Sequence, residues 1–143
     1  MRPKAFIAVL AAIAMTSLVA CSSDEPSEES QGSQVETTLH DYRIETSVES
    51  VPAGKVTFTI ENTGATEHEM VVIQTDVAIA DMAVEGHETN EEAPGMNPIG
   101  EVEDVQPGES TTLVLTLEPG RYVLLCNLPK HFERGMATEF QVT

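Results

Sequence analysis

The chain contains 143 residues, of which 24 are acidic and seven are basic, giving a formal net charge of −17. A surface this acidic repels nucleic acids and anionic lipid head groups, so we expect no nucleic-acid partner and favour basic proteins or cationic patches instead. The length suffices for one small domain behind an N-terminal leader.

The first twenty residues have the layout of a secretory signal peptide. Arg2 and Lys4 precede an apolar run from Ala5 to Ala20, which only Thr16 and Ser17 interrupt. Because this run is too short to span a bilayer and ends in small residues, we predict that residues 1–20 are removed during export.

The end of this leader, Leu18-Val19-Ala20-Cys21, resembles the lipobox of bacterial lipoproteins. Cleavage before Cys21 and lipidation of its sulfur would anchor the protein to the cell membrane, on the periplasmic or extracellular face. An ordinary signal peptide with an incidental cysteine is the alternative. If Cys21 is lipidated, Cys126 is the one free thiol of the mature chain in a compartment that oxidises thiols, which favours a metal-bound cysteine.

Residues 21–36 are predicted to form a lipidated and disordered acidic tether. Residues 22–36 contain one apolar residue, Val35, and no aromatic residue, so they cannot bury a core of their own. The mature chain would carry five basic against 24 acidic residues, a formal charge of −19. Residues 37–143 are predicted to form a single domain.

Turn signals recur through this domain and separate short runs rich in β-branched residues, which is typical of a β-sandwich or barrel. The turns are at Pro52-Ala53-Gly54, Asn62-Thr63-Gly64, Pro107-Gly108 and Pro119-Gly120. Strict alternation predicts strands over residues 56–61 and 113–117, each with one buried face. An earlier strand is predicted over residues 40–48, with Tyr42, Ile44 and Val48 on one face.

Residues 76–100 interrupt this pattern. Residues 76–85 are predicted to form a helix of two to three turns, closed by Gly86. The following residues 87–100 are polar and contain Pro94 and Pro98, so we expect a flap outside the sheets.

Three potential metal ligands of differing softness follow one another in a C-x4-H-x4-M loop, formed by Cys126, His131 and Met136. A thiolate, an imidazole and a thioether, together with one more imidazole, suit copper that cycles between Cu(I) and Cu(II). His68, in the segment Gly64-Ala-Thr-Glu-His68, is the candidate for the fourth ligand.

Strand parity tests this assignment. Cys126 shares its face with Tyr122 and Leu124, and Met136 shares its face with Phe140 and Val142, so both sulfurs are expected to point inward. His68 shares parity with Met70 and Val72, which places its ring between the sheets. A strand beginning, a strand end and a loop between strands can meet at one end of a sandwich.

These residues resemble the cupredoxin family of small type 1 copper proteins. The resemblance covers about Val35 to Thr143 and is strongest in two segments, Val51-Pro-Ala-Gly-Lys-Val-Thr-Phe58 with Asn62-Thr-Gly-Ala-Thr-Glu-His68, and Gly120-Arg-Tyr-Val-Leu-Leu-Cys126-Asn-Leu-Pro-Lys-His131 with Met136. It implies an all-β Greek-key sandwich or barrel that binds one copper ion, with His68, Cys126 and His131 as trigonal ligands and Met136 as the weak axial ligand.

The sequence departs from the family pattern at two positions. Lys130 stands where a small residue, often glycine, usually precedes the loop histidine. Glu69 stands where other members have an asparagine that joins the two ligand segments.

The resemblance implies a monomeric electron carrier rather than an enzyme. Four histidines in one sandwich cannot build the additional copper sites of a multicopper oxidase or nitrite reductase. A redox protein is expected to dock where the loop histidine, His131, reaches the surface. The expected docking face consists of Leu128, Pro129 and Phe132, with Lys130 and Arg134 as its cationic residues.

Other functions stay open. Delivery of copper to another exported cuproprotein is the main alternative, and a second Cu(I) site in the flap would suit it. Met82, His87 and Met96 could form that site, although packing of the flap explains the methionines equally well. A metal-free interaction module is the third possibility. His40 and His87 are expected to be ordinary surface histidines.

Overall fold

The computed structural model describes residues 32–143. The predicted signal peptide, the predicted lipidation site Cys21 and residues 22–31 of the predicted tether lie outside this range. Strand β1 begins at Ser33, within the segment predicted as tether. The fold therefore starts four residues earlier than predicted, because Val35 pairs with Phe58 of a neighbouring strand and is fully buried.

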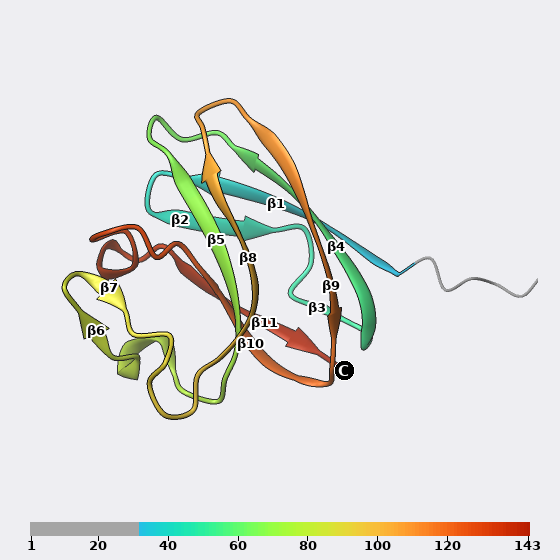
Figure 1. Cartoon of the computed structure of the whole chain (residues 1–143). Coiled ribbons are helices and arrows are strands. Elements are labelled where there is room, and N and C mark those ends of the chain that lie inside the picture. The colour runs from blue at the N-terminus through green and yellow to red at the C-terminus, as the bar shows by residue number, and fades with distance from the viewer. Residues whose placement is uncertain (1–31) are drawn as a thin grey trace, which may run out of the picture.

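Two β-sheets pack face to face (Figure 1). The first sheet has the order β2-β1-β4-β9 and consists of β1 (Ser33–His40), β2 (Arg43–Thr46), β4 (Gly54–Asn62) and β9 (Ser110–Leu117). The second has the order β3-β11-β10-β5-β8 and consists of β3 (Ser50–Val51), β5 (His68–Gln74), β8 (Asn97–Val105), β10 (Gly120–Leu125) and β11 (Ala137–Val142). The all-β sandwich predicted from the turn spacing is confirmed.

The main core lies between the sheets and follows the predicted alternation. In β4, Val56, Phe58 and Ile60 are fully buried, whereas the residues between them are more exposed. Phe58 of the first sheet meets Phe140 of the second edge to face, with ring centroids 5.6 Å apart. This contact is part of the buried core between the two layers.

The predicted strand over residues 40–48 is interrupted by a turn. β1 ends at His40 and β2 begins at Arg43, and between them Tyr42 has a φ of 63° in the left-handed region. Ile44 is buried as predicted, but Val48 is 41% exposed. Tyr42 leaves the shared face because the chain reverses at Asp41-Tyr42, and Val48 leaves it because β2 ends at Thr46.

The helix predicted over residues 76–85 is wrong. The segment forms a single 3-10 turn, η1 (Ile79–Asp81), followed by a hairpin of β6 (Val84–Glu85) and β7 (Glu88–Thr89). Gly86 and His87 form its two-residue turn with φ values of 63° and 75°, as a type I′ turn requires. Gly86 therefore reverses a hairpin instead of ending a helix.

The rest of the predicted flap includes a strand. β8 contains Pro98 and Gly100, and it pairs with β5 at the edge of the second sheet, where a proline is tolerated. The segment from η1 to β7 stays outside the sheets as predicted. It covers the outer face of β5 and β10, where Met82 packs in a second apolar cluster with Val71, Ile73, Val123, Leu125 and Phe132.

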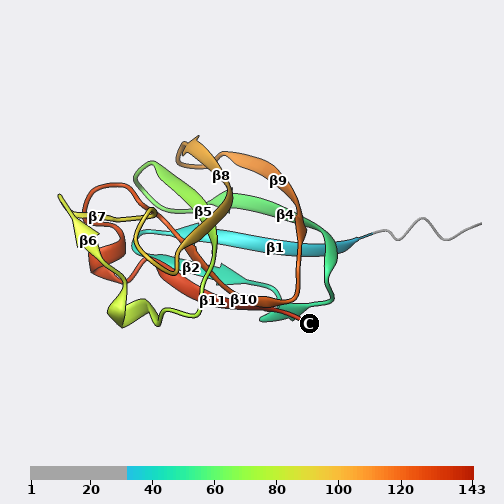
Figure 2. The ribbon, with the colours of Figure 1, turned by 60° about the horizontal axis from the view of Figure 1, so that its bottom comes forward.

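The flap hairpin and the loop after β10 lie together at one end of the sandwich, while β1 enters from the other end (Figures 1 and 2). The loop contains a second 3-10 turn, η2 (Phe132–Arg134). The N–H of Lys130 donates to the carbonyl of His87 at 2.8 Å, which joins the loop to the hairpin. Within residues 32–143, no helix has the length and apolarity needed to cross a bilayer.

Candidate metal centre

Strand pairing brings His68 and Cys126 together. β5 and β10 are antiparallel neighbours, with Val71 opposite Leu125, so the first residue of β5 lies near the residue that follows β10. His131, from the loop after Cys126, completes the group. One donor atom from each of these three side chains lies within 4.8 Å of the others.

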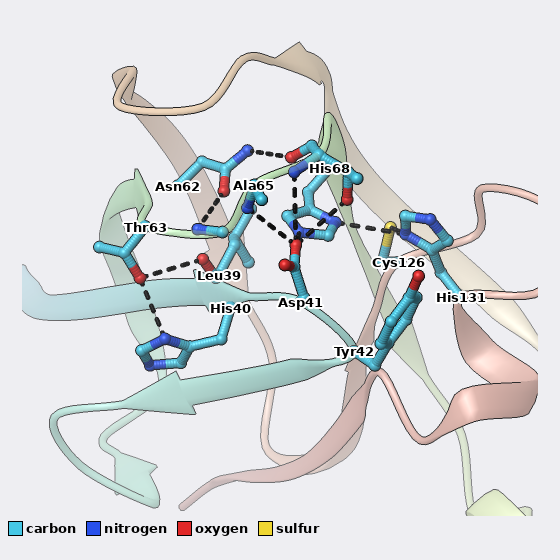
Figure 3. A network of polar contacts seen from close by, with 12 residues as sticks. Leu39, His40, Asp41, Tyr42, Asn62, Thr63, Ala65, His68, Cys126 and His131 are labelled. Carbon is cyan, nitrogen blue, oxygen red and sulfur yellow. Dashed lines mark hydrogen bonds and ion pairs between the residues drawn. The ribbon is translucent and has the colours of Figure 1, made fainter.

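The donor atoms face one another closely. Nδ1 of His68 lies 3.2 Å from Nδ1 of His131, which lies 3.3 Å from Sγ of Cys126 (Figure 3). Nitrogen and sulfur ligands about 2.0–2.3 Å from one ion are separated from each other by roughly 3–4 Å. The three side chains are therefore already spaced to share one metal ion.

Met136 lies beside this group. The N–H of Cys126 donates to the carbonyl of Met136, and the N–H of Met136 donates to the carbonyl of His131, both at 3.1 Å. Met136 is fully buried in the same cluster as Cys126. The inward direction that parity predicts for both sulfurs is confirmed, and His68 is fully buried with Met70 and Val72 as expected.

Left-handed backbone conformations shape the ligand loop. Lys130 has a φ of 70° and Gly135 a φ of 100°, and the N–H of His131 donates to the carbonyl of Leu128 at 2.9 Å. The conformation at Lys130 is one that glycine adopts without strain. The bond from its N–H to the flap holds the lysine in this conformation.

The thiol of Cys126 is shielded from water. Burial raises the pKa of Cys126 to about 11, although N–H groups of Glu69 and Leu128 act in the opposite direction. The N–H of Glu69 lies 3.5 Å from the sulfur. Without a metal the side chain is therefore a neutral thiol at neutral pH.

The imidazoles are neutral as well. Burial lowers the pKa of His68, against the opposing effect of Asp41. Burial also lowers the pKa of His131, and the neighbouring His68 and Arg134 lower it further. Neutral imidazoles keep a lone pair free for a metal.

Glu69 joins the two ligand segments. Its carboxylate accepts a hydrogen bond from the N–H of Asn127 at 2.8 Å, next to Cys126. Burial raises the pKa of Glu69 to about 7, and the nearby Glu101, Glu91 and Glu103 contribute to the rise. The carboxylate therefore makes the cross-link that an asparagine makes in the family pattern.

The remaining predicted candidates have other contacts. His40 lies 3.0 Å from both Glu45 and Thr63, and His87 pairs with Glu133 at 2.9 Å. Met82 and Met96 belong to the apolar cluster under the flap. The contacts in residues 32–143 thus give His87 a hydrogen bond to Glu133 and give the methionines a role in packing.

Three residues at the site were not predicted. Asp41 contacts His68, Tyr42 packs edge-on against the ring of His131 with centroids 5.3 Å apart, and the side chain of Asn127 bonds to Thr89 of the flap. Asp41 and Tyr42 lie in the β1–β2 turn, far from the ligands in sequence. Asn127 could have been predicted from the sequence, because it directly follows the proposed ligand Cys126.

Two imidazoles, a thiol and a thioether, three of them fully buried, are a donor set suited to copper. Soft sulfur donors favour Cu(I), imidazoles bind both Cu(I) and Cu(II), and harder cations prefer oxygen ligands. Zinc also binds nitrogen and sulfur, but a thioether is not among its usual protein ligands. The residues therefore fit copper.

Comparison with known proteins agrees with the fold. A model of the cupredoxin-like domain matches residues 7–138. No curated protein matches the chain.

Solved structures share the fold at low sequence identity. Dithionite-reduced auracyanin from the photosynthetic bacterium Roseiflexus castenholzii is 24% identical with a TM-score of 0.60, and the match covers 78% of this chain and 98% of that one. Rusticyanin from Thiobacillus ferrooxidans is 19% identical with a TM-score of 0.53, covering 78% and 79%. Auracyanin A, a "blue" copper protein from Chloroflexus aurantiacus, is 17% identical with a TM-score of 0.51, covering 77% and 99%.

Proposed function

The chain belongs to the family of cupredoxin-like domains, and we propose that it is a blue copper protein that transfers single electrons. The observation that carries the proposal is the group of His68, Cys126 and His131, whose donor atoms lie within 4.8 Å of one another. Met136 is the proposed fourth ligand. Bound copper would supply a one-electron couple between Cu(I) and Cu(II).

The protein's own residues would hold this couple in a fixed and dry setting. His68, Cys126 and Met136 are fully buried and come from strand ends or from a short closed loop. A site that need not rearrange between oxidation states exchanges electrons at little cost. His131 is partly exposed, so it would connect the buried donors to the surface.

Copper delivery is the less favoured alternative. A delivery protein must hand its ion to a new set of ligands, and three of the four proposed ligands here are fully buried. The second site that would suit a carrier also lacks support, because His87 pairs with Glu133 while Met82 packs in the apolar cluster.

Substitution of Cys126 tests the proposed site. The wild-type protein loaded with Cu(II) should show intense visible absorption from thiolate-to-copper charge transfer, and Cys126→Ala should lose it, because no other thiol lies in residues 32–143. His87→Ala, which removes an exposed histidine outside the group, is the control and should keep the band. A colourless wild-type protein, or equal spectra for wild type and Cys126→Ala, would exclude a blue copper site.

The proposed docking face surrounds the exposed edge of His131, with one correction to its membership. Phe132 is only 9% exposed and packs under the flap, so it contributes little surface. Leu128 is partly buried and Pro129 is exposed. We propose that these two residues form the apolar part of the face.

Lys130 and Arg134 would make this face locally cationic on an acidic protein. The guanidinium of Arg134 lies 4.6 Å from the centroid of the Tyr42 ring and bonds to its hydroxyl, so part of this side chain is held in place. Lys130 is exposed, and within residues 32–143 its ammonium forms no ion pair. Lys130 is therefore the residue best placed to attract a partner's negative charge.

Charge reversal at Lys130 tests the docking face. Oxidation of the Cu(I) protein by anionic hexacyanoferrate(III) should slow several-fold in Lys130→Glu at low ionic strength, and high salt should remove the difference. Lys55→Glu makes the same charge change at the opposite end of β4 from the site, and it should have a smaller effect. Equal rates for the two variants would contradict a cationic docking face.

The proposal places the protein outside the cytoplasm, anchored by lipid on Cys21. Its support is the signal-like segment 1–20 and the tetrapeptide Leu18-Val19-Ala20-Cys21. Expressed with its leader in a bacterium, the wild-type protein should sediment with membranes, whereas Cys21→Ser should appear in the soluble exported fraction. The same distribution for both would exclude the lipid anchor.

A further inference from the structure

The turn between β1 and β2 reaches the far side of a proposed metal ligand. Oδ1 of Asp41 lies 3.3 Å from Nε2 of His68, while Nδ1 of the same ring faces His131 at 3.2 Å (Figure 3). The His68 side chain is fully buried, and that of Asp41 is 39% exposed. The two ring nitrogens therefore face a carboxylate on one side and the donor group on the other.

Other donors hold the carboxylate in place. Oδ1 of Asp41 accepts hydrogen bonds from the N–H of Ala65 at 3.0 Å, from the N–H of Thr66 at 3.4 Å and from the hydroxyl of Thr66 at 3.2 Å. These bonds hold the pKa of Asp41 below its ordinary value, although partial burial acts in the opposite direction. The carboxylate is thus fixed by the 65–66 segment as well as by the imidazole.

The close approach of this segment depends on Gly64. A Cβ atom at Gly64 would lie 2.5 Å from Oδ1 of Asp41 and 2.8 Å from Nε2 of His68. The buried Asn62 supports the same segment, because its side chain donates to the carbonyl of Thr66 at 2.8 Å and accepts from the N–H of Gly64 at 2.9 Å. The residues around the contact between Asp41 and His68 therefore hold both groups in place.

We propose that Asp41 is a positioning residue for the metal ligand His68. Its carboxylate accepts the Nε2 proton, which leaves Nδ1 unprotonated and directed at the metal, and its negative charge favours Cu(II) over Cu(I). Carboxylates that bond to the outer nitrogen of a ligand histidine fix the ring and raise its basicity. The charge effect rests on the proposed copper function, whereas the effect on the ring proton does not.

The first test uses the metal-free protein. Nitrogen-15 NMR of the His68 ring should show the proton on Nε2 in the wild type. In Asp41→Ala the ring should become a mixture of both tautomers, because the acceptor is gone. A proton on Nδ1 in the wild type, or an unchanged Nε2 tautomer in Asp41→Ala, would overturn the proposal whether or not the protein binds copper.

The second test measures the effect of the charge. Asp41→Asn keeps the shape and an acceptor oxygen but removes the negative charge, so its reduction potential should rise above that of the wild type. Asp41→Ala should bind Cu(II) about 10- to 100-fold more weakly than the wild type. Because Asp41→Asn is nearly isosteric, it gives an answer even if Asp41→Ala fails to fold.

Glu118→Gln is the matched control. It removes one negative charge from an exposed residue in the turn between β9 and β10, at the other end of β10 from Cys126. Its potential should shift less than that of Asp41→Asn. Equal shifts in reduction potential would show that only the net charge of the protein acts, and they would overturn the proposal. A wild-type protein without the charge-transfer band would instead overturn the copper function. In that case the NMR result alone would decide the role of Asp41.

Discussion

The burial of the Cys126 thiol beside two imidazole rings is the constraint on which the rest of the site depends. A bare thiolate with no exposed surface would lack hydration and cost several kcal/mol, so the metal-free protein keeps the proton. This is why burial raises the pKa of the thiol to about 11. A metal ion replaces the proton and supplies the positive charge that makes a buried thiolate stable.

The fold meets this constraint by placing the proposed ligands at strand ends and in a short loop that is closed by its own hydrogen bonds. The pairing of β5 with β10 places His68 beside Cys126, and the hydrogen bonds between Cys126, His131 and Met136 close the ligand loop. The flap supports the loop from outside through Lys130 and His87. No donor has to be carried by a long, unsupported segment, and a site supported in this way suits electron transfer better than ligand exchange.

Local periodicity made the proposed ligands predictable. The inward direction of Cys126, Met136 and His68 follows from alternation along one strand, and neighbouring antiparallel strands bring their ends together. The Asp41 contact could not be predicted in the same way. It joins residues 27 positions apart, and it depends on a turn at Tyr42 that the continuous pattern of residues 40–48 concealed.

Tertiary packing explains why the predictions for the flap were wrong. Residues 76–85 have no strong breaker, yet the segment forms only one 3-10 turn, and Ile79 and Met82 pack on the outer face of the second sheet. Pro98 suggested a loop, but it lies in β8 at a sheet edge, where its missing N–H costs little. Phe132 was predicted at the surface, and the cluster under the flap buries it instead.

The most direct test of this account is the number of protons released when the metal-free protein binds copper. The pKa of Cys126 is raised to about 11, so the thiol is protonated at neutral pH, whereas lowered pKa values leave His68 and His131 neutral, with one ring nitrogen of each unprotonated and no proton released when that nitrogen binds the metal. A pH-stat titration with Cu(II) at neutral pH should therefore release about one proton per copper, and the apparent Kd should fall about tenfold for each unit rise in pH. Release of no proton would mean that copper binds without the buried thiol and would contradict the account.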